Sequence, residues 1–433
     1  MNFDTIVIGG GMAGLSSALR CLELGQKTAV IASGQSALHF SSGSIDLLSH
    51  LPKGEQVDDP LAALANYPSD YPTHPYAKLG TEKITQAIDW YQSTLTKLGV
   101  PLLNQENEQN HLHVTALGTF KASWLSQPFV YQFPMNLEAH QVQKMVLLSI
   151  DGFRDLQPKL TEDNLKQLKA FHQLEIDVVT LSTASFSNMR RNSCELRSID
   201  LSRLFARKEQ TKELIDFIKA NSKPGDLVVL PAIFEGIVGL ETLKQIEQEA
   251  KVVLSELPTM PPSLMGIRLE ETMRRAFIRQ GGTLLTGDHV LSGEFITNIQ
   301  GKKHLRAIFT RNHLDMPLCA KNFILASGSF FSNGLVADLH TVKEPIFGFT
   351  VKQKESRKEW YSERFFDKKS HPFLGMGLET DANNRPYKDE QLIQNVYCAG
   401  AILSGYNPVA EGCGGGVAIS TGFAAAEKTQ EKQ

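Results

Sequence analysis

A glycine-rich turn near the start of the chain constrains the fold more than any other feature. Residues 9–14, GGGMAG, have the spacing G-x-G-x-x-G. An apolar run at residues 3–8 precedes the turn, and residues 12–24 carry apolar side chains at helical spacing before a second apolar run at 28–31. This order predicts a strand, a tight turn, a helix and a parallel strand, the βαβ unit in which such a turn binds phosphate.

Each glycine of the turn has a physical reason. Gly9 permits the tight bend, Gly11 lets the backbone approach a phosphate, and Gly14 allows close packing of helix on strand. Free N–H groups at the start of the helix give a positive potential that suits an anion. We therefore predict a nucleotide- or flavin-binding turn, with a ligand-free turn as the alternative. Its residues are Gly9, Gly10, Gly11, Met12, Ala13 and Gly14, with Ser33 at the end of the second strand.

Two further glycine-rich turns follow predicted strands. The strand at residues 323–326 leads into LASG, and the strand at 395–399 leads into a glycine-rich loop and a predicted helix at 417–427. This helix start also suits an anion or a carbonyl group. Three such turns, spread from one terminus to the other, are hard to explain by packing alone. The candidate cofactor-binding residues here are Ser327, Gly328, Gly400, Ala401, Glu411, Gly412, Gly414, Gly415 and Gly416.

The pattern along the chain predicts an α/β protein with a discontinuous ligand-binding domain. Residues 136–260 alternate strand-like and helical segments of their own, which indicates an inserted α/β unit. We therefore expect a Rossmann-like flavin domain made from residues 1–135 and 261–433, with a cap or substrate domain at 136–260. Residues 34–75, rich in Ser, Gly and Pro, are expected to be mostly loop.

Charge and composition exclude several classes of function. The 433 residues carry a net charge of -3, so no large basic field is present and nucleic acid is not an expected partner. No apolar run reaches the ~18 residues of a membrane span, and no secretory signal is recognised. The cysteines are scattered, which predicts reduced thiols in a cytoplasmic protein and excludes a standard iron–sulfur cluster. They are Cys21, Cys194, Cys319, Cys398 and Cys413.

The order of the three turns resembles that of the flavoprotein family containing the fumarate reductase and succinate dehydrogenase flavoproteins. LASG at residues 325–328 takes the place of the family's ATG turn. The glycine-rich C-terminal segment takes the place of the helix whose N-terminus faces the flavin ring. This resemblance covers the two ends of the chain and implies a flavin cofactor.

A more specific resemblance covers nearly the whole chain. The stretches at residues 34–52, 117–126, 261–269, 279–288, 325–337, 344–348 and 411–416 resemble the B subunits of bacterial anaerobic glycerol-3-phosphate dehydrogenases. That family is described as binding FMN beside a catalytic A subunit and a membrane-bound iron–sulfur C subunit. The resemblance implies oxidation of sn-glycerol 3-phosphate to dihydroxyacetone phosphate, with electrons passed to menaquinone and then to fumarate or nitrate. It also implies a cytoplasmic protein attached peripherally to the inner membrane through its partners.

Two positions depart from the wider flavoprotein pattern. Ala32 stands where an acid usually holds the ribose of an adenosine, and Ala401 stands where an acid usually holds the ribityl chain. A charged hydrogen bond is worth about 1.5–3 kcal/mol, so the first loss should weaken FAD binding about 10–100-fold. FMN has no adenosine, so FMN is expected in preference to FAD. The second loss affects either flavin and leaves a flavin-poor site as an alternative.

Several side chains outside the turns are candidates for the site. His39 is a candidate to face the flavin, with a packing role as the alternative. Ser42 and Gly43 could contact the flavin edge or a phosphate, or form a simple serine-rich turn. Arg268 could clamp a substrate phosphate or balance a reduced flavin anion, or form a surface salt bridge. Glu411 could touch the ribityl chain or be a solvated loop acid.

No metal site is expected from the sequence. His111 and His113 share one face of a predicted strand without further ligands nearby, so we predict that both are structural. The catalytic residues, and which chain of the complex oxidises the substrate, stay open. Besides a flavin-dependent oxidoreductase subunit, two alternatives remain. One is a flavin-poor scaffold or electron-transfer component of the same complex, and the other is a free-standing FAD-dependent dehydrogenase.

Overall fold

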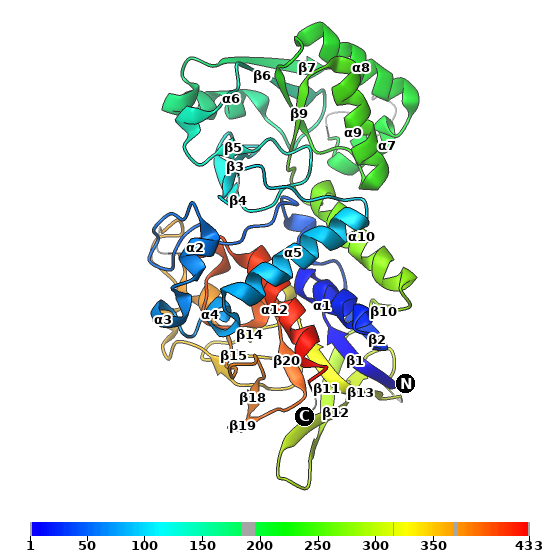
Figure 1. Cartoon of the computed structure of the whole chain (residues 1–433), viewed down its shortest axis with the longest axis vertical. Helices are drawn as coiled ribbons and strands as arrows, with labels where there is room; N and C mark the ends of the chain where they lie inside the picture. Colours follow the sequence, from blue (N-terminus) through cyan, green and yellow to red (C-terminus); the bar gives the residue numbers. More distant parts are fainter. Residues whose placement is uncertain (1, 107, 183–194, 315, 368–369, 432–433) are drawn as a thin grey trace. The chain divides into compact units, whose positions relative to one another are not determined.

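The computed structural model describes residues 2–106, 108–182, 195–314, 316–367 and 370–431, so Cys194 lies outside the described residues. The chain divides into two units, each with its own sheet (Figure 1). The first unit comprises Met1–Ala37, Asp46–Leu98 and Met273–Gln433. The second comprises Leu38–Ile45 and Gly99–Thr272.

The first unit is built on a seven-stranded sheet in the order β10-β2-β1-β13-β12-β11, with β20 also paired to β13. Strands β10, β2, β1, β13 and β20 run parallel, whereas β12 pairs antiparallel with both β13 and β11. Their bounds are Thr283–Thr286 (β10), Thr28–Ala32 (β2), Asn2–Ile8 (β1), Leu318–Leu325 (β13), Lys303–Thr310 (β12), Val290–Thr297 (β11) and Val396–Cys398 (β20). The predicted βαβ start and the α/β class are confirmed.

The register of this sheet brings the three predicted turns together. Ile8 at the end of β1 pairs with Leu325 at the end of β13, and Leu325 pairs in turn with Cys398 at the end of β20. All three turns therefore leave neighbouring parallel strands at the same carboxyl edge. Ligands of open α/β sheets bind outside this edge.

Helices cover the sheet of the first unit. Helices α1 (Met12–Glu23) and α12 (Gly414–Lys428) lie side by side, and α5 (Thr81–Lys97) packs on α12 (Figure 1). Both α1 and α12 are buried along most of their length, because small residues let them approach closely. At Gly422 an added Cβ would lie 2.5 Å from the backbone oxygen of Ala13.

The predicted loop at residues 34–75 holds more helix than expected. Short helices lie at Ala37–Phe40 (η1), Pro60–Leu64 (α2) and Tyr67–Asp70 (α3), and α4 (Pro75–Leu79) follows. Proline in the first turn of α2, α3 and α4 presets the helical φ angle, and Asp59 and His74 accept backbone N–H groups at the starts of α2 and α4. The high Ser, Gly and Pro content of residues 34–75 predicts loop, whereas these prolines and caps start short helices.

The second unit carries a four-stranded parallel sheet in the order β7-β6-β8-β9. Helices α6 to α9 connect and cover these strands, and a small antiparallel sheet, β4-β3-β5, accompanies them. The bounds are Lys144–Ile150 (β6), Pro158–Lys166 (α6), Glu175–Leu181 (β7), Ser198–Phe205 (α7), Lys208–Asn221 (α8), Leu227–Pro231 (β8), Gly236–Ala250 (α9), Val253–Leu257 (β9), His111–Val114 (β3), Phe120–Ser123 (β4) and Phe133–Pro134 (β5). The inserted α/β unit that the sequence indicates is present.

Residues 99–135 and 261–272 group with this inserted unit, although the sequence boundaries placed them in the flavin domain. The cause is tertiary packing. The ring of Phe120 stacks on Phe171 at 5.4 Å, and the amide of Gln127 donates to the Met265 oxygen at 3.0 Å. The assignment of flavin binding and capping to particular ranges stays a prediction.

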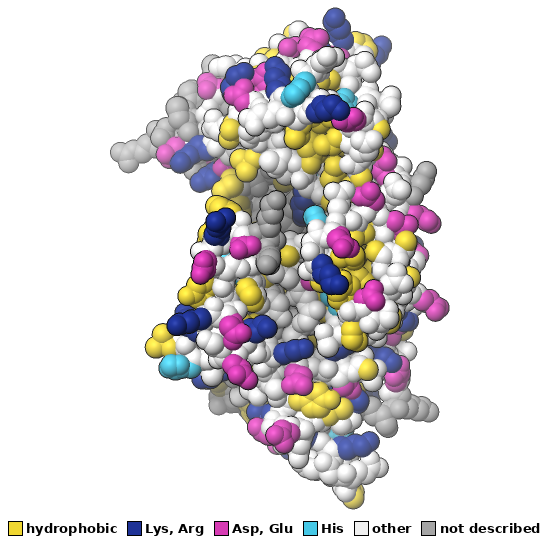
Figure 2. Space-filling view, turned by 90° about the vertical axis from the view of Figure 1, so that its left-hand side faces the viewer, with side chains coloured by type: hydrophobic (Ala, Val, Ile, Leu, Met, Phe, Trp, Pro, Cys, Tyr) yellow, Lys and Arg dark blue, Asp and Glu magenta, His cyan; other side chains and the backbone are white. Residues whose placement is uncertain are grey.

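Charged side chains of both signs are interspersed on the face drawn in Figure 2. This distribution agrees with the small net charge of the chain. Among the described residues, no helix is both long and apolar enough to cross a membrane.

Two buried histidines make the stability of the second unit depend on pH. Burial lowers the pKa of His111 to about 4 and that of His113 to about 3. Below pH ~6.5 the unfolded chain binds these protons and the folded chain does not, so stability present above that pH is lost as the pH falls toward 4. We expect the free energy of unfolding to drop by roughly 2–3 kcal/mol per histidine. Urea denaturation between pH 7 and 4 measures the loss.

The matched variants are His113→Gln and His340→Gln, of which the second alters an exposed side chain. Only His113→Gln should flatten the pH dependence, because only that change removes a buried titrating group. An equal fall in stability for wild type and His113→Gln would contradict this account.

Candidate functional site

The Gly9–Gly14 turn has the backbone geometry expected of a phosphate cradle. Gly9 has φ +117°, and an added Cβ would lie 2.1 Å from the Ala326 oxygen. A Cβ on Gly14 would lie 1.9 Å from the Gly9 oxygen, so both positions require glycine. At Gly11, which is half-buried, an added Cβ would make only an ordinary contact, 3.8 Å from Ser36 Cβ. The turn is therefore tight at Gly9 and Gly14 and less crowded at Gly11.

The start of α1 is free of a side-chain cap. Its N-cap residue is Gly11, which has no side chain to accept a hydrogen bond from the first turn. The first N–H groups of a helix need partners from outside the helix. An uncapped helix start at a half-buried glycine therefore fits a phosphate group.

The LASG turn contributes a buried polar atom that has no hydrogen-bond partner among the described residues. Gly328 has φ +82°, and Ala326 donates its N–H to the Ile8 oxygen at 2.8 Å, which ties the turn to β1. The Oγ atom of Ser327 is buried and makes no hydrogen bond to any described residue. A buried hydroxyl without a partner is costly, so this atom fits a polar group of a ligand. The uncapped start of α1 and this hydroxyl together fit a phosphate-bearing flavin.

The C-terminal turn is held against α1. Gly400 has φ +74°, and an added Cβ would lie 2.7 Å from the Cβ of Ala13. Its N–H donates to Thr421 Oγ1 at 2.9 Å. Ala401 is exposed, so the position where the family pattern has an acid opens to solvent or to a ligand.

The start of α12 differs from that of α1, because a carboxylate of the same chain occupies it. Asp46 Oδ2 accepts from the Gly414 N–H at 3.1 Å, and the Asp46 backbone oxygen accepts from Gly416 at 2.8 Å. A Cβ on Gly416 would lie 2.2 Å from Tyr76 Oη, and one on Gly412 would lie 2.6 Å from Ser49 Oγ. Packing and capping therefore account for these glycines, and their contact with a cofactor stays a prediction.

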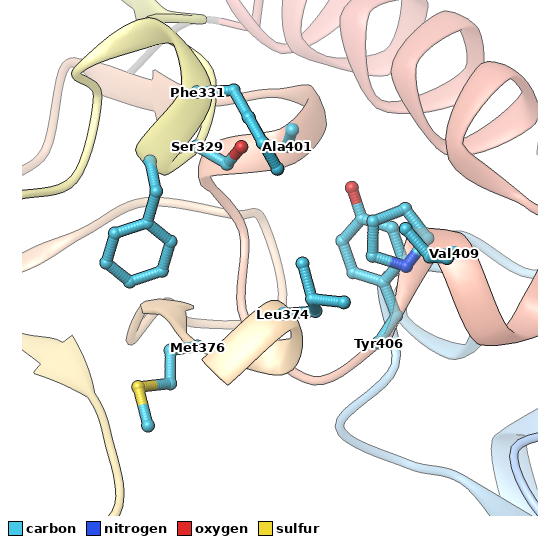
Figure 3. A pocket seen from close by; sticks show the side chains of 9 residues that line it. Ser329, Phe331, Leu374, Met376, Ala401, Tyr406 and Val409 are labelled. Atoms are coloured by element: carbon cyan, nitrogen blue, oxygen red, sulfur yellow. The ribbon is translucent and has the colours of Figure 1, made fainter. Parts of the chain in front are cut away.

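A pocket of about 150 Å³ adjoins the second and third turns. Mostly apolar side chains line it, and Ser329 and Tyr406 add hydroxyl groups (Figure 3). Its lining consists of Ser329, Phe330, Phe331, Leu374, Met376, Ala401, Tyr406, Pro408 and Val409. Because Ala401 is a candidate cofactor residue and Ser329 follows Gly328, the pocket lies next to the predicted site. Such a lining is typical of a cofactor site, whereas the volume lies below the ~300–1,000 Å³ usual for one, so the pocket itself has room for only part of a flavin.

Glu411 is buried rather than solvated. Its side chain contacts His74 Nε2 at 3.1 Å and the Asn407 N–H at 2.6 Å. Cys413 follows, and burial raises the pKa of its thiol well above the usual range. The solvated-acid alternative for Glu411 is therefore wrong. His74 carries no sequence signal as its partner, because 337 residues separate the two.

Four candidates lie in the second unit, and the structure gives each a partner there. His39 Nε2 lies 3.3 Å from Glu270 Oε2, while Ser42 Oγ accepts weakly from the Ser44 N–H at 3.4 Å. Gly43 has φ +71°, and an added Cβ would lie 2.6 Å from Gln127 and from Met265.

Arg268 is fully enclosed within the second unit. Its guanidinium donates to Gln127 Oε1 at 2.6 Å, to Glu256 Oε2 at 3.1 Å and to the Phe234 oxygen at 2.6 Å. The side chains of Arg268 and Glu256 are both 0% exposed. The salt-bridge alternative thus matches the geometry, but the bridge is buried and not on the surface. A phosphate-clamping role for Arg268 stays a prediction that these contacts do not favour.

The fold and the three turns define a flavoprotein of the FAD-binding class, and residues 4–417 match the family model described as "FAD binding domain". The chain is 57% identical to the B subunit of anaerobic glycerol-3-phosphate dehydrogenase from Aliivibrio fischeri (strain MJ11), over 100% of this chain and 96% of that protein. Proteins of the same name are 46% identical in Vibrio vulnificus (strain YJ016; 99% and 96% covered) and 38% identical in Actinobacillus succinogenes (100% and 99% covered). The chain therefore belongs to the family of B subunits of anaerobic glycerol-3-phosphate dehydrogenase.

Proposed function

We propose that the chain is the flavin-bearing B subunit of a complex that oxidises sn-glycerol 3-phosphate to dihydroxyacetone phosphate. Its partners would be a catalytic A subunit and an iron–sulfur C subunit, through which the protein attaches peripherally to the inner membrane. Electrons would pass to menaquinone and then to fumarate or nitrate. The observation that carries the proposal is the uncapped start of α1 together with the unpartnered Ser327 Oγ, in a chain of this family.

The residues of the first unit have separate tasks in this proposal. The Gly9–Gly14 turn holds a phosphate at the N–H groups of α1, and Ser327 supplies a hydroxyl for a polar group. The apolar pocket beside Ala401 excludes water from the cofactor. A bound flavin supplies the capacity to accept a hydride or electrons, while the protein sets orientation and potential.

We propose FMN as the cofactor, with FAD as the alternative that the family's description names. Ala32 ends β2, is 4% exposed and lies against Gly10, where an added Cβ would be 2.7 Å from that of Ala32. An alanine offers no oxygen to the hydroxyls of an adenosine ribose. FMN ends in its phosphate, which the α1 start can hold without that anchor.

Acid extraction of the purified complex, followed by HPLC, tests this assignment. We expect stoichiometric FMN, because the phosphate cradle is intact and the ribose anchor is absent. Extraction from the isolated chain shows whether it holds the flavin without its partners. A stoichiometric FAD peak would contradict the FMN assignment.

The variant Ala32→Glu is the matched test of the cause. Restoring an acid at the end of β2 should raise affinity for FAD about 10–100-fold relative to FMN. If the ratio of the two affinities stays unchanged, residue 32 does not select the cofactor.

A flavin-poor scaffold is the second candidate, and one observation favours it. Asp46 occupies the start of α12, so a carboxylate already takes the place of an anionic or carbonyl ligand there. Under this alternative the purified protein is colourless and still binds its partner chain. A flavin absorption spectrum in the isolated protein argues against it.

A further inference from the structure

His74 lies outside every predicted motif but is buried beside the C-terminal turn, with a side chain that is 1% exposed. Its Nδ1 accepts a hydrogen bond from the Tyr76 N–H at 3.0 Å at the start of α4. An imidazole nitrogen that accepts an N–H has no proton of its own, so the ring is neutral and the proton is on Nε2. Nε2 therefore donates to Glu411 Oε2 at 3.1 Å.

Glu411 transmits this contact to one wall of the pocket. Its other oxygen, Oε1, accepts the Asn407 N–H at 2.6 Å. Asn407 Oδ1 in turn accepts the N–H groups of Val409 and Ala410, both at 3.1 Å, at the start of α11 (Pro408–Glu411). Tyr406, Pro408 and Val409 form this pocket wall, which we call the 406–409 wall (Figure 3).

The same cluster has the spacing of a metal site, but its hydrogen bonds oppose that use. The potential ligand atoms of His74, Glu411 and Cys413 lie within 4.8 Å of one another. Coordination by Nε2 would need the lone pair that its proton occupies, since Tyr76 holds the other nitrogen. Burial raises the pKa of the Cys413 thiol, whereas a metal ligand must be a thiolate. A hydrogen-bonded clamp fits these contacts better.

We propose that His74 and Glu411 are positioning residues that fix the 406–409 wall and thereby set how tightly, and in what orientation, the pocket holds the flavin. This inference rests on the proposed function of the chain as a flavoprotein. It assigns the two residues no contact with substrate. Both carboxylate oxygens are engaged by the clamp, so Glu411 does not need to touch the ribityl chain to affect binding.

Two substitutions separate the two hydrogen bonds of His74. In His74→Asn the amide oxygen can still accept from Tyr76, but no group reaches Glu411. In His74→Gln the amide nitrogen can still donate to Glu411, while the cap of α4 is weakened. We expect His74→Asn to weaken flavin binding about tenfold, as for loss of a hydrogen bond to a charged group, and His74→Gln to stay within about twofold of wild type.

The readouts are the dissociation constant from flavin titration of the apo chain and the visible circular dichroism of the saturated protein. Visible circular dichroism reports the surroundings of the flavin ring. A spectral change that occurs in His74→Asn but not in His74→Gln therefore distinguishes positioning from a general loss of stability. Glu411→Gln is a second variant, because its amide would face the Nε2–H with a donor or break the Asn407 contact. We expect it to match His74→Asn in both readouts.

Equal affinity and an unchanged spectrum in His74→Asn, with wild type binding flavin, would overturn the clamp and leave the proposed function intact. Weak binding in His74→Gln with wild-type binding in His74→Asn would assign the effect to the α4 cap and also overturn it. A wild-type protein that binds no flavin, alone or in the complex, would instead defeat the proposed function.

Discussion

Replacing Arg268 by methionine is expected to lower the free energy of unfolding of the second unit by about 3–5 kcal/mol. The guanidinium satisfies a fully buried carboxylate, a glutamine oxygen and a backbone oxygen at once. Burial raises the pKa of Glu256, and the charge of Arg268 opposes this rise. Without the arginine the buried carboxyl must take up a proton or stay unpaired, and either outcome costs stability.

Urea denaturation followed by Trp124 fluorescence measures this effect within the second unit. Trp124 is the reporter once Trp90 and Trp360, which belong to the first unit, are replaced by phenylalanine. Arg154→Ala is the matched control, because its partner Glu195 lies 3.4 Å away in an exposed pair of the same unit. Exposed pairs contribute about 0–1 kcal/mol.

The double variant Arg268→Met/Glu256→Leu sharpens the test. Removing both charges should recover part of the loss, because the unpaired carboxylate is gone. If Arg268→Met alone is no more costly than Arg154→Ala, the ion pair contributes little to this unit. Such a result would also reopen a substrate-binding role for Arg268.

Gly14→Ala and Gly11→Ala are expected to have opposite effects on fold and ligand. A methyl group added at residue 14 would meet the Gly9 oxygen at 1.9 Å, so we expect a loss of about 3 kcal/mol in the stability of the first unit. A methyl group at residue 11 meets nothing closer than 3.8 Å, so stability should change by less than ~0.5 kcal/mol. It would, however, enter the space in which we place the phosphate, and flavin affinity should fall roughly 10–100-fold.

Urea denaturation of the apo protein and flavin titration, applied to both variants, separate these effects. If Gly11→Ala binds flavin as wild type does, the phosphate does not lie at the start of α1. If Gly14→Ala is as stable as wild type, the turn can relax in a way that the close approach to Gly9 does not suggest.

The sequence predicts those parts of the fold and site that rest on local chemistry. The spacing of Gly9, Gly11 and Gly14, together with the flanking strand and helix, requires only neighbouring residues, and the observed βαβ unit follows it. The turns after β13 and β20 were also predicted, because a short apolar strand that runs into glycine has few other structures available.

Contacts between distant residues could not be predicted in this way. Nothing near Arg268 in the sequence indicates that Gln127 and Glu256 will enclose it. The sequence therefore suggests a surface salt bridge where the structure has a buried one. Asp46 and His74 are ordinary loop residues until the fold brings them to α12 and Glu411. The boundary near residue 99 was missed for the same reason, since ring contacts such as Phe120 with Phe171 join segments that share no local pattern.

The division of the chain into interleaved units governs the order in which the protein can fold during synthesis. All residues of the inserted unit have been made once Thr272 is added, whereas β13, the central neighbour of β1, begins only at Leu318. Chains emerge from the ribosome N-terminus first, and domains generally fold as units. The inserted unit can therefore be complete while β1 still exposes an unpaired apolar edge, the kind of edge that promotes aggregation. In a nascent chain of this protein, β1 therefore lacks its neighbour β13 until more than 300 later residues have been made.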